Sequence, residues 1–142
     1  MTTPPIPPPT PVVIRLLNSI PAVTDHVGDR ISVVLDAQLP ALRVALVGYA
    51  GAAATDWEAC PMFQVEVWAE DEIEAEEIAW VINNHWTTAT REIVGQAAVH
   101  GRWVVQNPLS LPARMTSEDS DEDTNLARYL VNVAFRLTGV TA

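Results

Sequence analysis

The side chains best suited to nucleophilic or metal chemistry are few and widely spaced in this sequence. The only soft metal ligands are Cys60, His26, His85 and His100, and no two of them stand at the short intervals that form a zinc site. The segment 58–61 around the cysteine has no local signature of a catalytic thiol. We therefore expect no metal site and no catalytic residues, and we interpret Cys60 as a small hydrophobic side chain.

The glycine and serine patterns lack catalytic motifs as well. The six glycines form neither a G-x-G-x-x-G sequence nor a P-loop, and no serine stands in a nucleophile elbow. We expect no cofactor and no enzymatic activity.

Acidic side chains gather in two runs, residues 70–77 and 118–123. The first run suits the solvated first turn of a helix, with contact to a basic partner surface, or a metal or catalytic role, as alternatives. The second run is too polar to pack and predicts an exposed loop, which a partner could order. Its acids are candidate interface residues: Glu118, Asp119, Asp121, Glu122 and Asp123.

Composition limits the class of protein. The chain has 142 residues, of which 49% are hydrophobic and 18% charged, as expected for one soluble globular domain. Eighteen acids against eight arginines give a net charge of −10, so the basic stripe that binds a nucleic-acid duplex is absent. We expect no specific nucleic-acid recognition, no membrane span and no secretory signal. A lone cysteine excludes an internal disulfide and favours a reducing compartment.

Hydrophobic periodicity predicts an α+β fold, with a mostly antiparallel sheet of about five strands and one long and one short helix packed on one face. Residues 1–11 read as a proline-rich extended arm and residues 12–142 as a single domain. The short helix is expected from a capping Thr10 to the residues before Pro21, and the long helix over residues 71–89. The strands are expected over residues 30–35, 42–48, 63–69, 97–106 and 128–137.

The five tryptophans exceed what a small core usually holds. Trp86 lies on the apolar face of the long helix, and Trp103 shares a predicted strand face with Val99 and Val105, so both are expected in the core. Trp68 lies on the strand face opposite Phe63. Large aromatic side chains that the core does not use are typical interface anchors, so Trp68 is a candidate interface residue.

Five pieces of the chain occur in an order that is informative as a whole. They are Ile20-Pro21-Ala22-Val23, Gly28-Asp29-Arg30-Ile31, the strand from Cys60 to Ala69 with its following helix, the strand from Val99 to Leu111 leading into the acidic loop, and the closing segment from Arg128 to Arg136. In this order the chain, from about Pro11 onward, resembles the tail terminator proteins of long-tailed bacteriophages, also called tail completion or minor tail proteins.

The resemblance implies a structural virion protein. Proteins of this family form a hexameric ring that caps the tail tube, stops its polymerisation and offers a docking surface to the head-completion or connector proteins. The implied partners are thus further copies of the chain, the tail tube protein and a head-completion protein, with DNA passing through the ring lumen. The implied location is the head–tail interface of the virion, after assembly in the host cytoplasm. The family pattern does not require the proline-rich arm.

A closed ring of identical subunits needs two different surfaces on each subunit. An edge strand offers unpaired backbone groups, and Trp68, Arg128 and Tyr129 lie at strand positions that could contribute to such a surface. The arm lacks donors, so we expect it to bury apolar side chains in a groove of a neighbouring protein and not in its own core. Its candidate contact residues are Pro4, Pro5, Ile6, Pro7 and Pro8.

Two other classes of function remain open. One is a different neck protein that joins head and tail, which would dock on the portal side without affecting the length of the tube. The other is a small ligand-binding or enzymatic α+β domain, which would need a concave polar pocket.

Overall fold

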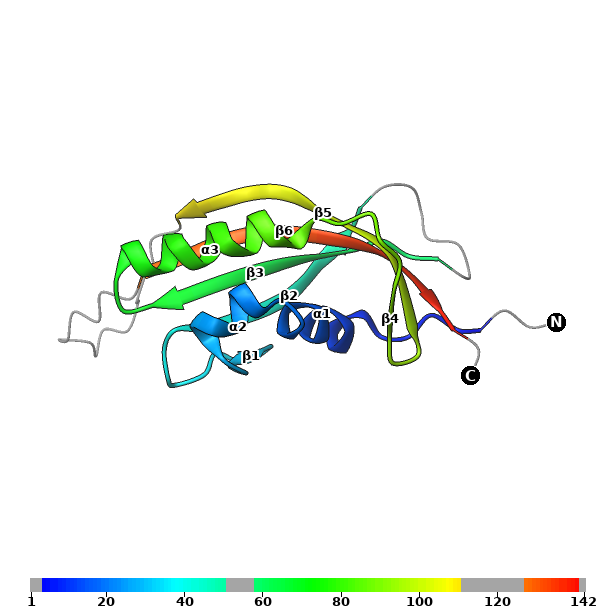
Figure 1. Ribbon diagram of the computed structural model, residues 1–142, viewed down its shortest axis with the longest axis horizontal. Helices are drawn as coiled ribbons and strands as arrows, with labels where there is room; N and C mark the ends of the chain where they lie inside the picture. The colour runs from blue at the N-terminus through cyan, green and yellow to red at the C-terminus, as the bar shows by residue number, and fades with distance from the viewer. Residues whose placement is uncertain (1–3, 51–57, 111–126, 141–142) are drawn as a thin grey trace.

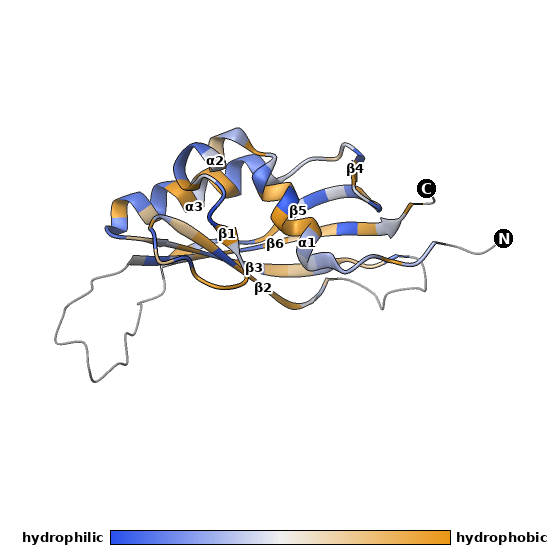
Figure 2. Ribbon diagram, turned by 90° about the horizontal axis from the view of Figure 1, so that it is seen from below, coloured by the Kyte–Doolittle hydropathy of each residue, from blue (hydrophilic) through white to orange (hydrophobic). Residues whose placement is uncertain are grey.

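The computed structural model describes residues 4–50, 58–110 and 127–140. In this part of the chain six strands form one sheet, in the order β1-β2-β3-β6-β5-β4, and three helices pack on one face of it (Figures 1 and 2). The predicted α+β class is confirmed. The elements are α1 (Pro9–Asn18), α2 (Pro21–Val27), β1 (Ile31–Ser32), β2 (Ala41–Tyr49), β3 (Pro61–Ala69), α3 (Glu72–Trp86), β4 (Glu92–Val94), β5 (Ala97–Ser110) and β6 (Ala127–Gly139).

The four long strands pair antiparallel, as predicted, whereas the short edge strands differ from prediction. The strand expected over residues 30–35 contains only two residues, and it runs parallel to β2. Val33 and Val34 leave it with side chains 49% and 71% exposed, because no neighbouring element covers them among the described residues. Strand β4 was not predicted, since three residues are too few to show alternation. It turns into β5 at Gly95, whose φ of 61° suits glycine.

Helix α3 covers the centre of the sheet and confirms the predicted long helix. Asp71 caps it, accepting a hydrogen bond from the Glu74 backbone N–H at 2.8 Å, which satisfies one of the free donors of the first turn. The helix contacts β3, β5 and β6. Its buried residues are those of the predicted apolar stripe, Ala75, Ile78, Ala79, Ile82 and Trp86.

Two proline-initiated helices precede the sheet. Helix α1 begins at Pro9, three residues before the predicted start of the domain at residue 12, and Thr10 lies inside the helix instead of capping it. Helix α1 ends before Pro21, as predicted. Pro21 also starts a second helix, α2, which was not predicted. Proline suits the first turn of a helix because its missing N–H would have no intrahelical partner there.

The described part of the arm rests on its own domain. Ile6 is half-buried and packs against the core, and a Cβ added at Gly139 of β6 would overlap the Pro5 carbonyl oxygen. Figure 1 shows this segment beside the last residues of β6. The expectation that the arm lies away from its own core is therefore wrong for these residues. Pro5 and Pro8 are its exposed members.

A bulge in β5 reverses the direction of two important side chains. Between the pairs Val99–Leu137 and Arg102–Phe135, β5 uses one residue more than β6, and an extra residue exchanges the two faces of a strand. Arg102 consequently lies on the helix side and is 8% exposed, whereas Trp103 is 36% exposed. The prediction of Trp103 as a core residue is wrong for this reason.

Trp86 links helix α3 to the centre of the sheet. Its ring meets Phe135 edge-on at 6.2 Å between centroids, and its indole N–H donates to the Ala134 carbonyl at 3.1 Å. The guanidinium of Arg102 lies 5.0 Å from the centre of the indole ring. One side chain thus supplies packing, a buried hydrogen bond and a cation–π contact.

We expect Trp86→Phe to lower the free energy of unfolding by about 2–4 kcal/mol, because it removes a buried donor and leaves space beside Phe135. Trp80→Phe is the matched control: Trp80 is on the same helix but is 40% exposed, and its substitution should cost less than about 1 kcal/mol. Urea unfolding of both variants measures the difference. Equal losses would contradict the assigned role of Trp86.

Candidate functional site

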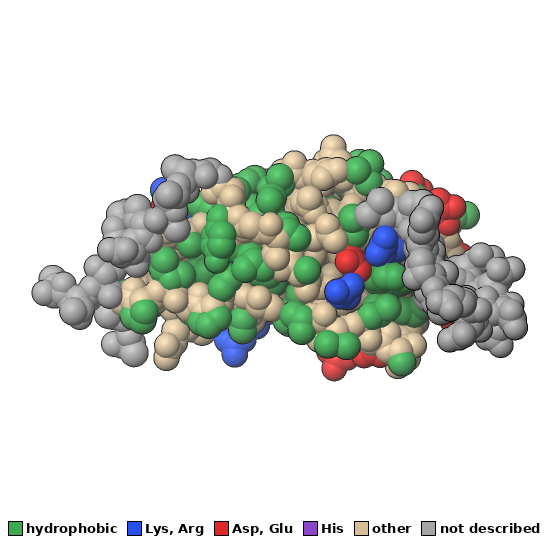
Figure 3. All heavy atoms as spheres, turned by 180° about the vertical axis from the view of Figure 1, so that it is seen from behind, with side chains coloured by type: hydrophobic (Ala, Val, Ile, Leu, Met, Phe, Trp, Pro, Cys, Tyr) green, Lys and Arg blue, Asp and Glu red, His purple; other side chains and the backbone are tan. Residues whose placement is uncertain are grey.

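The sheet face turned away from the helices, called the outer face here, is the most distinctive surface of the protein. No described helix covers it, and hydrophobic side chains spread over much of it (Figure 3). Trp103 and Leu109 of β5 pair with Ala134 and Leu130 of β6, and they are 36% and 52% exposed. Large apolar groups left in contact with water in this way mark interaction surfaces.

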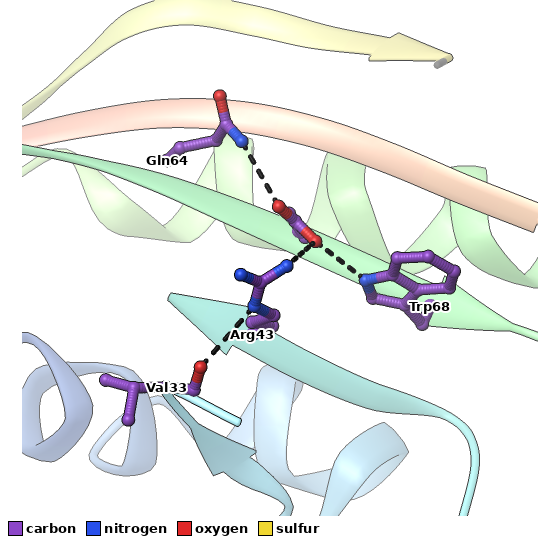
Figure 4. A network of polar contacts seen from close by, with 5 residues as sticks. Val33, Arg43, Gln64 and Trp68 are labelled. Atoms are coloured by element: carbon purple, nitrogen blue, oxygen red, sulfur yellow. Dashed lines mark hydrogen bonds and ion pairs between the residues drawn. The ribbon is translucent and has the colours of Figure 1, made fainter. Parts of the chain in front are cut away.

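A polar cluster interrupts this apolar face around Glu66 of β3 (Figure 4). The carboxylate accepts from the Trp68 indole N–H at 2.9 Å and from the Gln64 amide at 3.2 Å, and it lies 3.4 Å from a guanidinium nitrogen of Arg43. Arg43 also donates to the Val33 carbonyl at 3.4 Å. Glu66 is only 5% exposed, so these partners replace the water that its charge needs.

Two of the predicted interface residues meet at this cluster. Trp68 lies on the outer face, as its position opposite Phe63 indicated, and the guanidinium of Arg128 stands 5.3 Å from the centre of its ring. Trp68 is nevertheless only 9% exposed. Its indole is engaged by Glu66 and covered by Arg128, so it is a buried support of the surface and not an exposed anchor.

Tyr129 does not join them. It lies on the helix side of β6, is 7% exposed, and its hydroxyl donates to a carboxylate oxygen of Glu76 at 3.3 Å. Burial, followed by the nearby Glu76, raises the pKa of the Tyr129 hydroxyl above its ordinary value, so the group stays protonated and keeps its role as donor. The predicted acidic interface, Glu118, Asp119, Asp121, Glu122 and Asp123, lies outside the described residues.

The residues suited to metal or nucleophilic chemistry lie on different elements of the fold. His100 hydrogen-bonds the Thr138 hydroxyl at 2.8 Å, His85 is exposed on α3, and Cys60 precedes β3. Within residues 4–50, 58–110 and 127–140, no three His, Cys, Asp or Glu side chains are grouped to hold a metal ion. No helix in that same part of the chain is long and apolar enough to cross a membrane.

Cys60 has the electrostatics of an unactivated thiol. Burial, followed by the charge of Glu58, raises its pKa above the ordinary value, and Arg136 opposes this only as the smallest contribution. Arg136 is itself paired with Glu58, nitrogen to oxygen, at 2.9 Å. Reactive cysteines carry the opposite shift, because the thiolate is the nucleophile.

An open groove of about 620 Å³ lies between α2 and the start of α3. Its carboxylates lie in the first turns of α3, where free backbone N–H groups favour negative charge. None of the described residues that line the groove is a buried polar side chain. The lining residues are His26, Asp71, Glu72, Ile73, Glu74 and Glu77.

Burial of Glu66 was not predicted. The alternation of residues 63–67 places it on the outer face, as observed, and an outward acid in a strand is ordinarily solvated. The missing information is register: β2 and β3 set Arg43 opposite Glu66. An arginine and a glutamate at outward positions of neighbouring strands could have indicated an ion pair. The sequence, however, does not determine which residues of the two strands face each other.

Comparison with known proteins adds no family to these observations: no protein-family model matches the chain, and a search of curated proteins finds no significant relative. The resemblance to tail terminators rests on the sequence pattern.

We expect Glu66→Gln to lower the free energy of unfolding by about 1–3 kcal/mol, because the neutral amide weakens three charge-assisted contacts at a buried position. Glu77→Gln, on the exposed face of α3, is the control and should change stability by less than about 0.5 kcal/mol. Thermal unfolding of the two variants tests this. A stable Glu66→Gln protein would mean that the cluster does not hold the outer face together.

We also expect native Cys60 to react with iodoacetamide at pH 8 several times more slowly than the same residue in urea, because burial and the raised pKa of its thiol both reduce the accessible thiolate. Glu58→Gln should partly restore the rate, since it removes the charge that opposes ionisation. Mass spectrometry of the alkylated protein provides the measurement. A faster reaction in the native protein would identify an activated nucleophile.

Proposed function

We propose that this chain is a structural subunit of a phage tail terminator ring, which caps the tail tube and offers a surface to head-completion proteins. In this role the chain assembles through its own surface and carries out no chemistry. The virion is then its location, and further copies, the tube protein and a head-completion protein are its partners.

The observation that carries the proposal is the burial of Arg102 together with the exposure of its neighbour Trp103. Burying an arginine while exposing a tryptophan reverses the usual preference of both side chains, and local rules of this kind are broken mainly at functional sites. Arg102 is compensated in part inside the domain by the Trp86 ring and by Glu92, whose carboxylate lies 3.4 Å away, while its Nε and Nη1 atoms have no hydrogen-bond partner among the described residues. Among the described residues Trp103 stays 36% exposed on the outer face, so a partner that covers it would recover the free energy of its burial.

The surface also favours a protein partner over a small ligand. Drug-sized ligands bind in concave, mostly apolar cavities, whereas the groove at α3 is open and acidic and the outer face is broad and apolar. Assembly into a ring must bring many negative charges together. A subunit of net charge −10 therefore needs contact surfaces that are themselves uncharged, and much of the outer face meets this condition.

Electron microscopy of the purified full chain tests the proposal at the level of assembly. We expect closed six-fold rings at high protein concentration and moderate salt, since salt screens the repulsion between subunits. A monomer that binds a small molecule in a closed pocket would instead favour the ligand-binding alternative.

The length of tails separates a tail terminator from another neck protein. Without the protein, we expect an infected host to accumulate headless tails of irregular length, because no ring stops polymerisation of the tube. Tails of normal length that fail to join heads would favour a joining protein on the portal side. Supplying the chain from a plasmid should restore normal tails and controls for effects on neighbouring genes.

A further inference from the structure

At both edges of the sheet a short strand covers only part of a longer one. Strand β1 covers β2 at Leu42 and Arg43, and strand β4 covers β5 from Ala97 to Val99, with Thr88 reaching Arg102. Beyond these contacts, residues 44–49 of β2 and 103–106 of β5 have no second strand beside them among the described residues. We call these segments the β2 edge and the β5 edge. Pro108, which lacks an N–H, limits pairing further along β5.

The backbone groups of the two edges point outward at matching places. The Leu42 N–H donates to Arg30 on the β1 side, so by alternation Leu46, which is 41% exposed, directs its N–H and C=O groups to the same side beyond the end of β1. Arg102 exchanges backbone hydrogen bonds with Thr88, so Val104 is the next residue of β5 to face outward. Each edge therefore offers a donor and an acceptor to an additional strand.

The register of the sheet places these groups at one level. Leu46 pairs with Phe63, Phe63 with Val133, and Val133 with Val104. Leu46 and Val104 are thus the two ends of a single row across four strands. By the same pairings Gly48 and Trp103 end the next row, through Met62 and Ala134.

The direction of the strands makes the two edges complementary. Strands β2, β3, β6 and β5 alternate in direction, so β2 and β5 run oppositely. A second copy rotated about an axis along the strands keeps its strand directions, and its β2 would meet β5 of the first copy antiparallel. The contact uses a different edge on each side, which is the heterologous arrangement that generates rings.

We propose that copies of this chain join edge to edge, with the β2 edge of one copy adding to the β5 edge of the next as an antiparallel strand. Leu46 then faces Val104, and Trp103 covers Gly48 of the neighbour, where no side chain competes for space. Neither edge carries a charged residue, so strands approach without bringing like charges into contact. The proposal rests on the proposed function only in that the joined sheet closes into a ring.

The decisive experiment blocks each edge separately. Lysine protects edge strands from pairing, so we choose Leu46→Lys for the β2 edge and Val105→Lys for the β5 edge, at positions 41% and 44% exposed. Each substitution also makes the net charge less negative, which by itself favours association. Ile73→Lys, at a position 78% exposed on α3, is the control with the same change of charge. Circular dichroism and thermal unfolding establish that each variant remains folded.

Sedimentation velocity then distinguishes the kinds of contact. We expect the wild type and Ile73→Lys to assemble, and each blocked variant alone to be monomeric at concentrations about tenfold above those that assemble the wild type. An equimolar mixture of the two blocked variants should form a dimer and nothing larger, because one intact β2 edge and one intact β5 edge remain. A blocked variant that dimerises alone would show that like edges pair, and would overturn the proposal.

A disulfide tests the register directly and does not depend on the lysine variants. In a Cys60→Ser background, Leu46→Cys with Val104→Cys should cross-link neighbouring copies under mild oxidation, since directly opposed residues lie within disulfide reach. Absence of cross-linking in an assembled sample would overturn the proposed pairing, as would a wild type that stays monomeric at every concentration.

If rings form and both lysine variants still form them, the edge pairing is wrong while the ring function stands. If the edges pair but yield open filaments, the ring function is wrong and the edge pairing stands.

Discussion

The antiparallel pairing of β3 with β6, from Met62–Ala134 to Ala69–Ala127, sets the conditions for every other part of the molecule. It joins two segments far apart in the sequence, and it lies at the centre of the sheet with β2 on one side and β5 on the other. Phe63 and Phe135 stack across it with ring centroids 5.9 Å apart, and Trp86 of α3 packs on that stack. The pairing closes the long segment between β3 and β6, which costs conformational entropy, and it provides the surface on which α3 and β5 pack.

The same pairing determines what the outer face can be. Alternation along β3 and β6 sends Val65 and Val131 towards the helices and Gln64 and Asn132 outward. On the outer face the row of Gln64 and Asn132 therefore lies between the row of Glu66 and the apolar row of Met62 and Ala134. A buried carboxylate among apolar neighbours is costly unless its partners are fixed. Arg43 of β2 reaches Glu66 and Arg128 of β6 covers Trp68, so these two contacts favour one register on either side of β3. A surface held in one register can recognise a partner of defined shape.

Much of this fold follows from periodicity in the sequence, and the exceptions have physical causes. The strand 63–69 and the stripe on α3 were predictable because each covers several repeats of its period. Strand β4 and helix α2 are too short to show a period, and β1 is shorter than predicted because its pairing with β2 ends at Ser32. For the candidate surface, the face of Trp68 was predictable and its burial was not, because Arg128 covers it from a position on β6 that only the register fixes.

The largest discrepancy between sequence and structure is also the most informative one. A single extra residue in β5 moves Arg102 to the helix side and Trp103 to the outer face. Burial lowers the pKa of the Arg102 guanidinium, with Glu92 opposing that shift, so the interior bears a cost for the arrangement, which the contacts with Trp86 and Glu92 reduce. A straight strand would have avoided this cost by placing the tryptophan inside. The bulge therefore gives up stability within the domain for an exposed tryptophan beside an open strand edge, and that exchange is useful to a protein whose function is to bind another protein.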